Sequence, residues 1–358
     1  MREDWDIRLF KDVFDLQMGK TPDRKNFSLF GGDNTWVSIK DLDGKYISNS
    51  KECISDEAAK NIRLVKRGTV IMSFKLTIGK TAIAGKDLYT NEAIMAFNLR
   101  NGYDIDASFL YYYLKNYRWE GSNKAVMGIT LNKATISKHK IAIPPKSTQL
   151  SIVSELDKLN ELIQIKKEQL KDYDALAQSI FYEMFGDPVV NEKGWEVKKF
   201  GDLFKLKSGD GLSSKDFKTG IYPVYGGNGI SGYHNSFNMK GCYIIIGRVG
   251  IYCGNVRKVD GEFWLTDNAF RLIYKENEQN PFFILYLLNI LDLHQYANAA
   301  AQPVISNLTL KSINVPLPPL SLQQSFAHKI EQIERQKAEV QKTITDLETL
   351  LAARMQYW

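Results

Sequence analysis

The sequence predicts an α+β chain in which a β-rich globule followed by one long helix occurs twice. All 10 prolines and all 25 glycines of the 358 residues lie outside the windows 147–185 and 321–358. Interior glycine and proline destabilise a helix by about 1 and 3 kcal/mol each, so their exclusion predicts two long helices. The windows are also copies at a fixed offset of 174 residues, which indicates an internally repeated architecture.

The first globule (1–145) and the second globule (189–319) have the composition of small β-rich domains. Short β-branched runs such as TVIMSF (69–74) and CYIIIG (242–247) alternate with glycine and asparagine turns. The stretch TISKHKIAIPP (135–145) matches TLKSINVPLPP (309–319), and TNEAI (90–94) matches TDNAF (266–270). We therefore expect a β core with a few short helices in each globule.

Both windows carry the apolar pattern of a left-handed coiled coil. Apolar residues recur at alternating spacings of four and three, a period of 3.5. At 1.5 Å per residue each helix would be about 60 Å long, which is too long to be buried lengthwise in one small globule. We therefore expect the two helices to pack on each other. The predicted seam consists of Ile152, Leu156, Leu159, Ile163, Lys166, Leu170, Tyr173, Ala177, Ile180 and Met184 in the first helix, and of Phe326, Ile330, Ile333, Lys337, Val340, Ile344, Leu347 and Leu351 in the second, with one lysine among the apolar residues of each.

Proline and glycine mark the ends of these helices. The pairs Pro144-Pro145 and Pro318-Pro319 come just before the two windows, where proline can precede a helix but not lie inside it. Gly186 ends the first window. We assign residues 146–188 to the central long helix, including the residues that end it, and residues 320–358 to the C-terminal long helix.

The positive charge is concentrated on the globules. The chain carries +6 overall. The two helical windows carry −3 and 0, which leaves +9 on the globules and short joints. A polyanion such as double-stranded DNA would bind there.

Several protein classes are excluded by composition. The longest nearly apolar stretch, 282–291, is half the length of a membrane span, so we expect no membrane association. The N-terminal residues have no apolar signal core. Cys53, Cys242 and Cys253 are too few and too scattered for a disulfide framework or a four-cysteine zinc site. We expect a cytoplasmic protein.

Motifs of catalysis are incomplete or missing. The two Gly-Lys-Thr triplets at 19–21 and 79–81 lack the earlier glycine of a phosphate loop. The GxGxxG match at 227–232 has no βαβ unit around it and is interpreted as a glycine-rich turn. The four histidines are isolated, so no metal site and no catalytic residue is predicted.

Lysine, arginine and asparagine side chains in the polar turns are the candidates for DNA contacts. Lysine and arginine neutralise phosphates, and asparagine and arginine can bond to base edges in pairs of hydrogen bonds. The candidates are Lys40, Lys75, Lys80, Asn91 and Lys124 in the first globule, and Lys218, Tyr225, Asn228, His234, Arg248, Asn255 and Asn268 in the second. By sequence, Lys75 falls near Arg248, and Asn91 aligns with Asp267.

The whole chain resembles the specificity subunit of type I restriction-modification enzymes. The resemblance is carried by WVSIKDL (36–42), GTVIMSFKLTIGKTAIAG (68–85) and TNEA (90–93) in the first copy. In the second copy it is carried by YPVYGGNGISGYHNSFN (222–238), YIIIGRVGIYCGNV (243–256) and FWLTDNAF (263–270). The motif Pro-Pro-x-x-x-Gln occurs before both helices, at 144–149 and 318–323.

The resemblance implies two target-recognition domains separated by two antiparallel helices in a pseudo-twofold arrangement. Each domain would read one half of a split, asymmetric DNA site. The helices would set the spacer length and dock two methyltransferase subunits, with restriction and translocase subunits in the full complex. The chain would be non-catalytic and hold no cofactor, because S-adenosylmethionine would be bound by the methyltransferase subunits.

Three alternatives stay open. The chain could be the recognition subunit of another restriction or phage-defence system that shares these domains. It could be a DNA enzyme that acts alone, which the missing motifs oppose. It could be a coiled-coil scaffold that does not bind DNA, which the +9 on the globules opposes.

Overall fold

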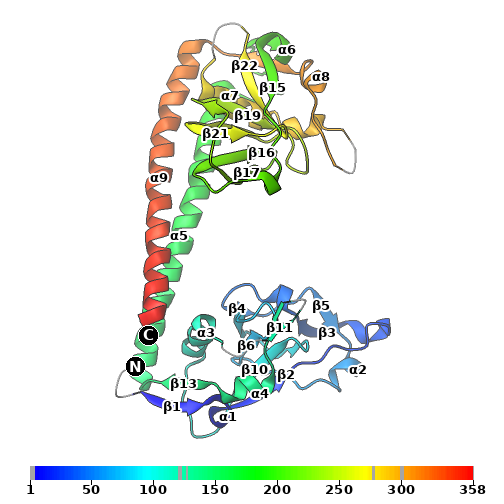
Figure 1. The fold of residues 1–358 in the computed structure, drawn as a ribbon, viewed down its shortest axis with the longest axis vertical. Coiled ribbons are helices and arrows are strands. Elements are labelled where there is room, and N and C mark those ends of the chain that lie inside the picture. The colour runs from blue at the N-terminus through cyan, green and yellow to red at the C-terminus, as the bar shows by residue number, and fades with distance from the viewer. Residues whose placement is uncertain (1–4, 120–122, 126–127, 276–278, 299–301, 358) are drawn as a thin grey trace. The chain divides into compact units, whose positions relative to one another are not determined.

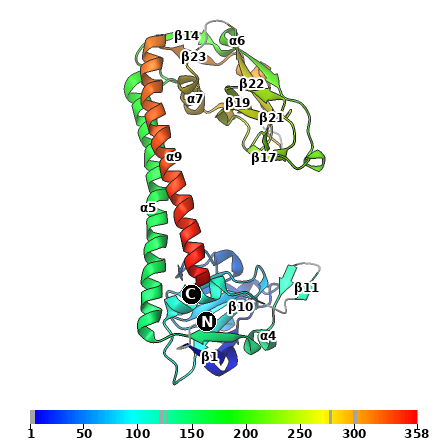
Figure 2. The ribbon, with the colours of Figure 1, turned by 60° about the vertical axis from the view of Figure 1, so that its left-hand side comes forward.

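The structure is a computed structural model that describes residues 5–119, 123–125, 128–275, 279–298 and 302–357, with the backbone alone for 123–125 and 128–130. The chain forms two compact units (Figures 1 and 2). Unit 1 comprises Met1–Ile165 and Ile344–Trp358, and unit 2 comprises Lys166–Thr343. Each unit therefore contains one globule and one part of each long helix, and each is described by itself.

Unit 1 is built on a five-stranded sheet. The sheet has the strand order β2 (Phe14–Met18), β10 (Ile94–Leu99), β6 (Val70–Ser73), β8 (Thr81–Ala84) and β4 (Tyr46–Ile47). A second sheet has the order β5 (Glu52–Ile54), β3 (Phe30–Val37) and β9 (Tyr89–Thr90), and a third has the order β11 (Asn123–Ala125), β12 (Gly128–Thr130) and β7 (Lys75–Leu76). The remaining elements are the pair β1 (Asp6–Leu9) and β13 (Lys140–Ile143), with α1 (Phe10–Val13), α2 (Asp56–Ala59), α3 (Ala107–Asn116) and α4 (Lys133–Lys138).

Unit 2 has the same general plan, with one strand fewer in the main sheet and one more in the second sheet among the described residues. The order is β15 (Phe204–Ser208), β22 (Ala269–Tyr274), β19 (Tyr243–Gly247) and β20 (Val256–Val259). The second sheet has the order β17 (Gly229–His234), β16 (Tyr222–Gly226), β21 (Glu262–Leu265) and β18 (Met239–Lys240). The remaining elements are the pair β14 (Glu196–Lys199) and β23 (Asn314–Leu317), with α6 (Phe200–Leu203), α7 (Pro281–Ile290) and α8 (Asn307–Leu310).

The hydrogen-bond register shows that the two units are copies. In both units the second sheet contains one parallel pair, Val37 beside Thr90 in unit 1 and Tyr225 beside Leu265 in unit 2. The next residue then donates its N–H back across that pair, Asn91 to Val37 O at 3.0 Å and Thr266 to Tyr225 O at 2.9 Å. The fold is mixed α and β with a repeated globule-plus-helix unit, as the sequence predicts.

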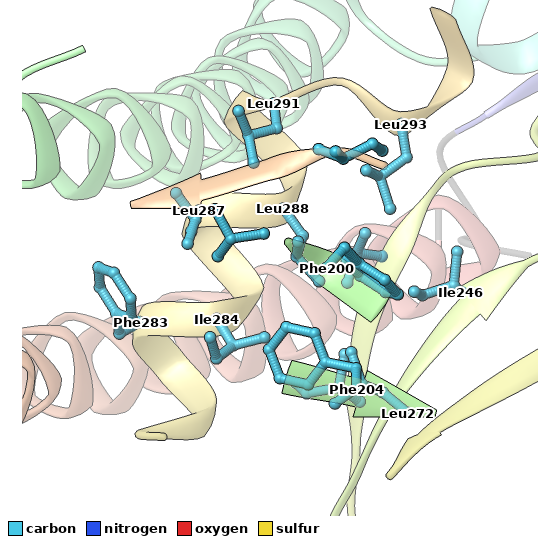
Figure 3. Close-up of a cluster of buried hydrophobic side chains, with 14 of the residues drawn as sticks. Phe200, Phe204, Ile246, Leu272, Phe283, Ile284, Leu287, Leu288, Leu291 and Leu293 are labelled. Carbon is cyan, nitrogen blue, oxygen red and sulfur yellow. The ribbon is translucent and has the colours of Figure 1, made fainter. Parts of the chain in front are cut away.

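In each unit one helix covers one face of the main sheet and forms the apolar core with it. In unit 2 this helix is α7, whose Phe283, Ile284, Leu287 and Leu288 are fully buried against Phe204, Ile246 and Leu272 of the sheet (Figure 3). In unit 1 the corresponding helix α3 buries Phe109, Leu110 and Leu114 against Val70 and Phe97. Each large apolar side chain buried in this way contributes about 1.5–3 kcal/mol to folding.

The two long helices are continuous over α5 (Lys146–Phe185) and α9 (Leu320–Tyr357). Every residue of the predicted seam is buried or half-buried. Within unit 2 the helices are antiparallel, because Asp174 bonds to Lys337 and Phe181 contacts Phe326. Within unit 1 the Glu155 carboxylate accepts a hydrogen bond from Arg354. The predicted domain boundaries at 145, 188 and 319 stay predictions, since the compact units divide both helices.

The seam departs from its predicted course in the last turns of α5. Phe181 and Phe185 are fully buried, whereas the expected seam residues Ile180 and Met184 are only partly buried. The reason is that these turns pack on α7 as well as on α9. The ring of Phe181 stacks on Phe283 of α7 at 6.0 Å and meets Phe326 of α9 at 5.6 Å.

A candidate nucleic-acid interface

The loops that carry most of the predicted contacts gather at one end of the main sheet in each unit. Neighbouring strands of this sheet are antiparallel except at β4, so strands β2 and β6 end where β10 and β8 begin. In unit 1 this loop end comprises residues 19–21, 38–41, 74–80 and 91–93. In unit 2 the corresponding loop end comprises residues 209–213, 226–229, 248–255 and 266–268.

Backbone hydrogen bonds join these loops to one another. In unit 1, Lys20 N donates to Thr90 O at 2.9 Å, and Phe74 N donates to Ala93 O at 3.0 Å. In unit 2, Arg248 N donates to Asn268 O at 2.9 Å. The glycine-rich turn 226–229 of unit 2 lies against the loop that follows β19, because a Cβ on Gly227 would come within 2.5 Å of Val249 O. Glycine is the residue that permits this approach.

The register shows which residues correspond at the two loop ends. Ser73 N donates to Lys80 O, and Gly247 N donates to Asn255 O, so Lys80 and Asn255 occupy one position. Lys40 and Asn228 each lie three residues past the parallel pair at Val37 and Tyr225. Lys40, Lys80, Asn228 and Asn255 are all exposed.

Two sequence alignments of candidate residues are shifted by one position. Phe74 and Arg248 make the same backbone bonds, so the counterpart of Arg248 is the buried Phe74 and not Lys75. Asn91 corresponds to Thr266 and not to Asp267. The side-chain oxygen of each accepts an N–H two residues ahead, Asn91 from Ala93 at 3.1 Å and Thr266 from Asn268 at 3.4 Å.

Arg248 is half-buried at the position where unit 1 has the buried Phe74. Its guanidinium lies over the ring of Phe270 at 5.3 Å, and Nη1 is 3.4 Å from both Ser208 Oγ and Asp267 O. Its Nε is buried and has no hydrogen-bond partner among the described residues. A charged group with an unsatisfied donor at an open loop end is chemically suited to an anionic ligand.

Asn228 and Asn268 line one hollow at the loop end of unit 2. This hollow has a volume of about 450 Å³ and is also lined by Ser231, Thr266 and Gln302. The exposed amide groups of Asn228, Asn268 and Gln302 provide both donors and acceptors for base edges, whereas Thr266 is buried. Lys75 of unit 1 is half-exposed. The side-chain oxygen of Asn91 accepts a hydrogen bond within its own turn.

Three candidates lie elsewhere. His234 is only 6% exposed, its Nδ1 accepts the Lys218 N–H at 3.0 Å, and its ring packs on Trp264. This burial and these partners give His234 a structural role in unit 2, and its contact with DNA stays a prediction. Lys218 is exposed beside it, at the other end of β17 from the glycine-rich turn. Lys124 lies in β11, whose side chains are outside the described residues.

Tyr225 and the overlooked Arg257 lie on the other side of the glycine-rich turn. Tyr225 is half-buried against Phe263, and burial raises the pKa of its phenol while Arg257 partly offsets this. Arg257 is exposed, and its Nη2 is 3.4 Å from Asn228 O. Sequence reasoning missed Arg257 because the run Val-Arg-Lys-Val of β20 gives no sign that this strand lies at an open edge of the sheet.

The described residues contain no group of three or more histidine, cysteine, aspartate or glutamate side chains that could hold a metal ion. Cys253 Sγ lies 3.5 Å from His294 Nδ1, but that nitrogen is also 2.8 Å from Cys253 O. Nδ1 therefore donates to the carbonyl, and burial raises the pKa of the thiol, so the pair is structural. None of the described helices is long and apolar enough to cross a lipid bilayer.

Comparisons with known proteins concern the family and the fold of the chain. Residues 2–172 and 192–349 match the family described as type I restriction modification DNA specificity domain. The type I restriction enzyme EcoprrI specificity subunit of Escherichia coli is 26% identical over 345 residues, covering 90% of this chain and 86% of the relative. The MjaIX specificity subunit of Methanocaldococcus jannaschii is 29% identical over 238 residues, covering 60% and 55%.

Solved structures show the same fold. The S subunit of a type I restriction-modification system from M. genitalium aligns with a TM-score of 0.56 at 18% identity, covering 98% of this chain and 95% of that one. A chain from a structure titled for complex assembly and conformational transition of the type I R-M system aligns with a TM-score of 0.63 at 17% identity, covering 99% and 97%. Two matched segments that together span most of the sequence, and a fold shared along the whole chain, lead to one conclusion: this chain belongs to the family of type I restriction-modification DNA specificity proteins.

Proposed function

We propose that each unit reads one half of a bipartite, asymmetric DNA sequence through its loop end. One observation carries this proposal: the same backbone positions hold different polar side chains in the two units. Lys80 corresponds to Asn255 by hydrogen-bond register. Three residues past the parallel pair, unit 1 has Lys40 in a 3-10 turn and unit 2 has Asn228 in the turn between β16 and β17. A repeated scaffold with different groups at matching positions is what two different half-sites require, since lysine and asparagine bond to different base edges.

The two continuous helices would set the distance between the half-sites. Helix α5 has 40 residues and α9 has 38, so each is about 60 Å long at 1.5 Å per residue. A DNA turn advances about 34–36 Å, so helices of this length can span the unread base pairs between two major-groove contacts.

The chain would act as the non-catalytic recognition subunit of a larger complex. Methylation of adenine requires base flipping and S-adenosylmethionine, which two methyltransferase subunits would supply, with restriction and translocase subunits completing the assembly. The name of the E. coli relative describes a subunit of a type I restriction enzyme. The same DNA-reading role would hold in another restriction or phage-defence system.

The direct test changes one loop end only. Asn228, Asn255 and Asn268 are replaced together by alanine, and the chain is assembled with its methyltransferase subunits on plasmid DNA. Sequencing of the methylated adenines should show an altered or relaxed preference in one half-site. Asn235→Ala, an exposed asparagine away from the loop end, is the matched control. A change in both half-sites would contradict the proposal.

A further inference from the structure

Unit 2 has an open sheet edge at the position where unit 1 has a fifth strand. In unit 1, β4 pairs in parallel with β8, placing Tyr46 beside Ile83. Ile83 N donates to Lys45 O at 2.8 Å, and Gly85 N donates to Ile47 O at 2.7 Å. In unit 2, β20 is the last strand in the sheet, and no described strand pairs with its outer edge.

The register identifies the unpaired groups of β20. Gly247 N donates to Asn255 O, and Gly241 N donates to Gly261 O, both at 2.9 Å across the β19–β20 ladder. Antiparallel bonding alternates, so the odd-numbered residues of β20 face β19, and Val256, Lys258 and Asp260 face outward. Because Lys80 corresponds to Asn255, Lys258 and Asp260 occupy the positions of Ile83 and Gly85.

One outward position of β20 is already satisfied by a side chain. Val256 N lies 3.4 Å from Asn289 Oδ1, and Asn289 Nδ2 lies 3.3 Å from Val256 O. Asn289 belongs to α7. The backbone of Lys258, the next outward residue, has no such partner among the described residues. An unpaired strand edge of this kind is a template for another strand.

A cleft of about 1010 Å³ lies along this edge. It is lined by β20, by α7 through Phe282, Leu285 and Tyr286, and by Asp174 and Lys337 of the two long helices within unit 2. In unit 1 the equivalent space holds β4. There Lys45 donates to both oxygens of Asp157 in α5, at 2.6 and 2.7 Å, which fastens β4 to the helix.

The charge of the open edge shows what kind of strand it suits. Arg257 and Lys258 stand on the two faces of β20 where unit 1 has the neutral, buried Ala82 and Ile83. Neither cation has an ion pair among the described residues, although Lys258 lies 4.9 Å from the ring of Phe282. Lys337, in contrast, is neutralised by Asp174 at 2.7 Å and Glu334 at 3.0 Å.

We propose that the outer edge of β20 binds an extended, acidic segment of a partner polypeptide as an added parallel strand. The segment would take the backbone bonds of Lys258 and Asp260 that β4 takes from Ile83 and Gly85. Its carboxylates would pair with Arg257 and Lys258, and an apolar residue would contact Phe282 and Leu285. The inference rests on the proposed function only in naming a methyltransferase subunit as the source of the segment.

The experiment uses the purified complex of the chain with its methyltransferase subunits and a carbodiimide. This reagent joins a lysine amine to a carboxylate only when the two groups are in contact. Mass spectrometry should find Lys258 joined to an aspartate or glutamate of a methyltransferase subunit. Absence of that product, while the subunits remain associated, would overturn the proposal.

Two variants measure the contribution of the edge. Lys258→Pro removes the outward-facing N–H of β20, and proline is tolerated on an edge strand. Arg257→Glu reverses the charge of the second cation. Each should weaken the affinity for the methyltransferase subunit at least tenfold. Lys205→Glu on β15, the opposite edge of the same sheet, makes the same charge change and should have no effect.

DNA affinity of the chain alone is measured in parallel. If Arg257 served as a phosphate contact instead, Arg257→Glu would weaken DNA binding and lower its salt dependence by about one ion, with subunit affinity unchanged. That result would overturn this inference and leave the proposed function intact. Failure of the wild-type chain to bind DNA would affect the proposed function alone.

Discussion

Gln149 and Gln323 are separated by 174 residues and make corresponding hydrogen bonds. Gln149 Oε1 accepts the N–H of Asp106 at 2.8 Å, and Gln323 Oε1 accepts the N–H of Asn280 at 3.1 Å. Each Nε2 donates to the first proline carbonyl of the preceding pair, Pro144 at 3.0 Å and Pro318 at 2.8 Å. Asp106 and Asn280 are the N-caps of α3 and α7. These two glutamines therefore fasten each long helix to its globule.

Replacing either glutamine by leucine should destabilise its unit. Both side chains are 1% exposed, so the change leaves a part-buried N–H and a buried proline carbonyl without their glutamine partner. The expected loss is about 2–4 kcal/mol of unfolding free energy. Urea unfolding followed by circular dichroism measures it. Gln324→Leu, at the exposed neighbouring position, should change stability by less than about 0.5 kcal/mol, and an equal loss there would refute the role given to Gln323.

The observed seam contains Phe181 where the predicted seam contains Ile180, so variants of these two residues distinguish the two seams. Phe181→Ala should cost about 3–5 kcal/mol, because the ring is fully buried between α7 and α9. Ile180→Ala should cost clearly less, because Ile180 is only partly buried. Thermal unfolding of both variants provides the comparison. A larger loss of stability for Ile180→Ala than for Phe181→Ala would instead support the seam with uniform 4-3 spacing.

Lys80 and Asn255 occupy the same position and should differ in what they contribute to DNA binding. Lys80→Ala should weaken binding to all sequences and reduce the slope of log affinity against log salt by about 1, since one phosphate contact is lost. Asn255→Ala should leave the slope unchanged and alter preference at one base pair. Fluorescence anisotropy over a series of salt concentrations distinguishes the two. Equal slopes for wild type and Lys80→Ala would remove Lys80 from the interface.

The length of the helices should control the spacer. One heptad inserted after Ile165 in α5 and after Thr343 in α9, where the compact units divide, lengthens both helices by about 10 Å. The unread spacer should then grow by about three base pairs. Insertion into α5 alone is the control and should disrupt the seam. An unchanged spacer with the double insertion, in a folded protein, would refute the spacer role.

The sequence predicts the repeat, the long helices and most of the seam because these features depend on local pattern. Pro-Pro-x-x-x-Gln is visible in the sequence, and the structure shows that its glutamine bonds to the start of α3 or α7. The one-position shifts at Phe74 and Asn91 were not predictable, because they follow from strand register. The burial of His234 and the open edge at Lys258 depend on strands far apart in the chain, which short sequence patterns do not report.

The central claim is that each globule reads its own half-site. Residues 189–319 are exchanged for the corresponding segment of another family member, and the hybrid is assembled with its methyltransferase subunits. The methylated adenines of host DNA are then mapped by sequencing. The account predicts that one half-site changes while the other half-site and the spacer stay the same. A hybrid that changes both half-sites, or neither, would contradict it.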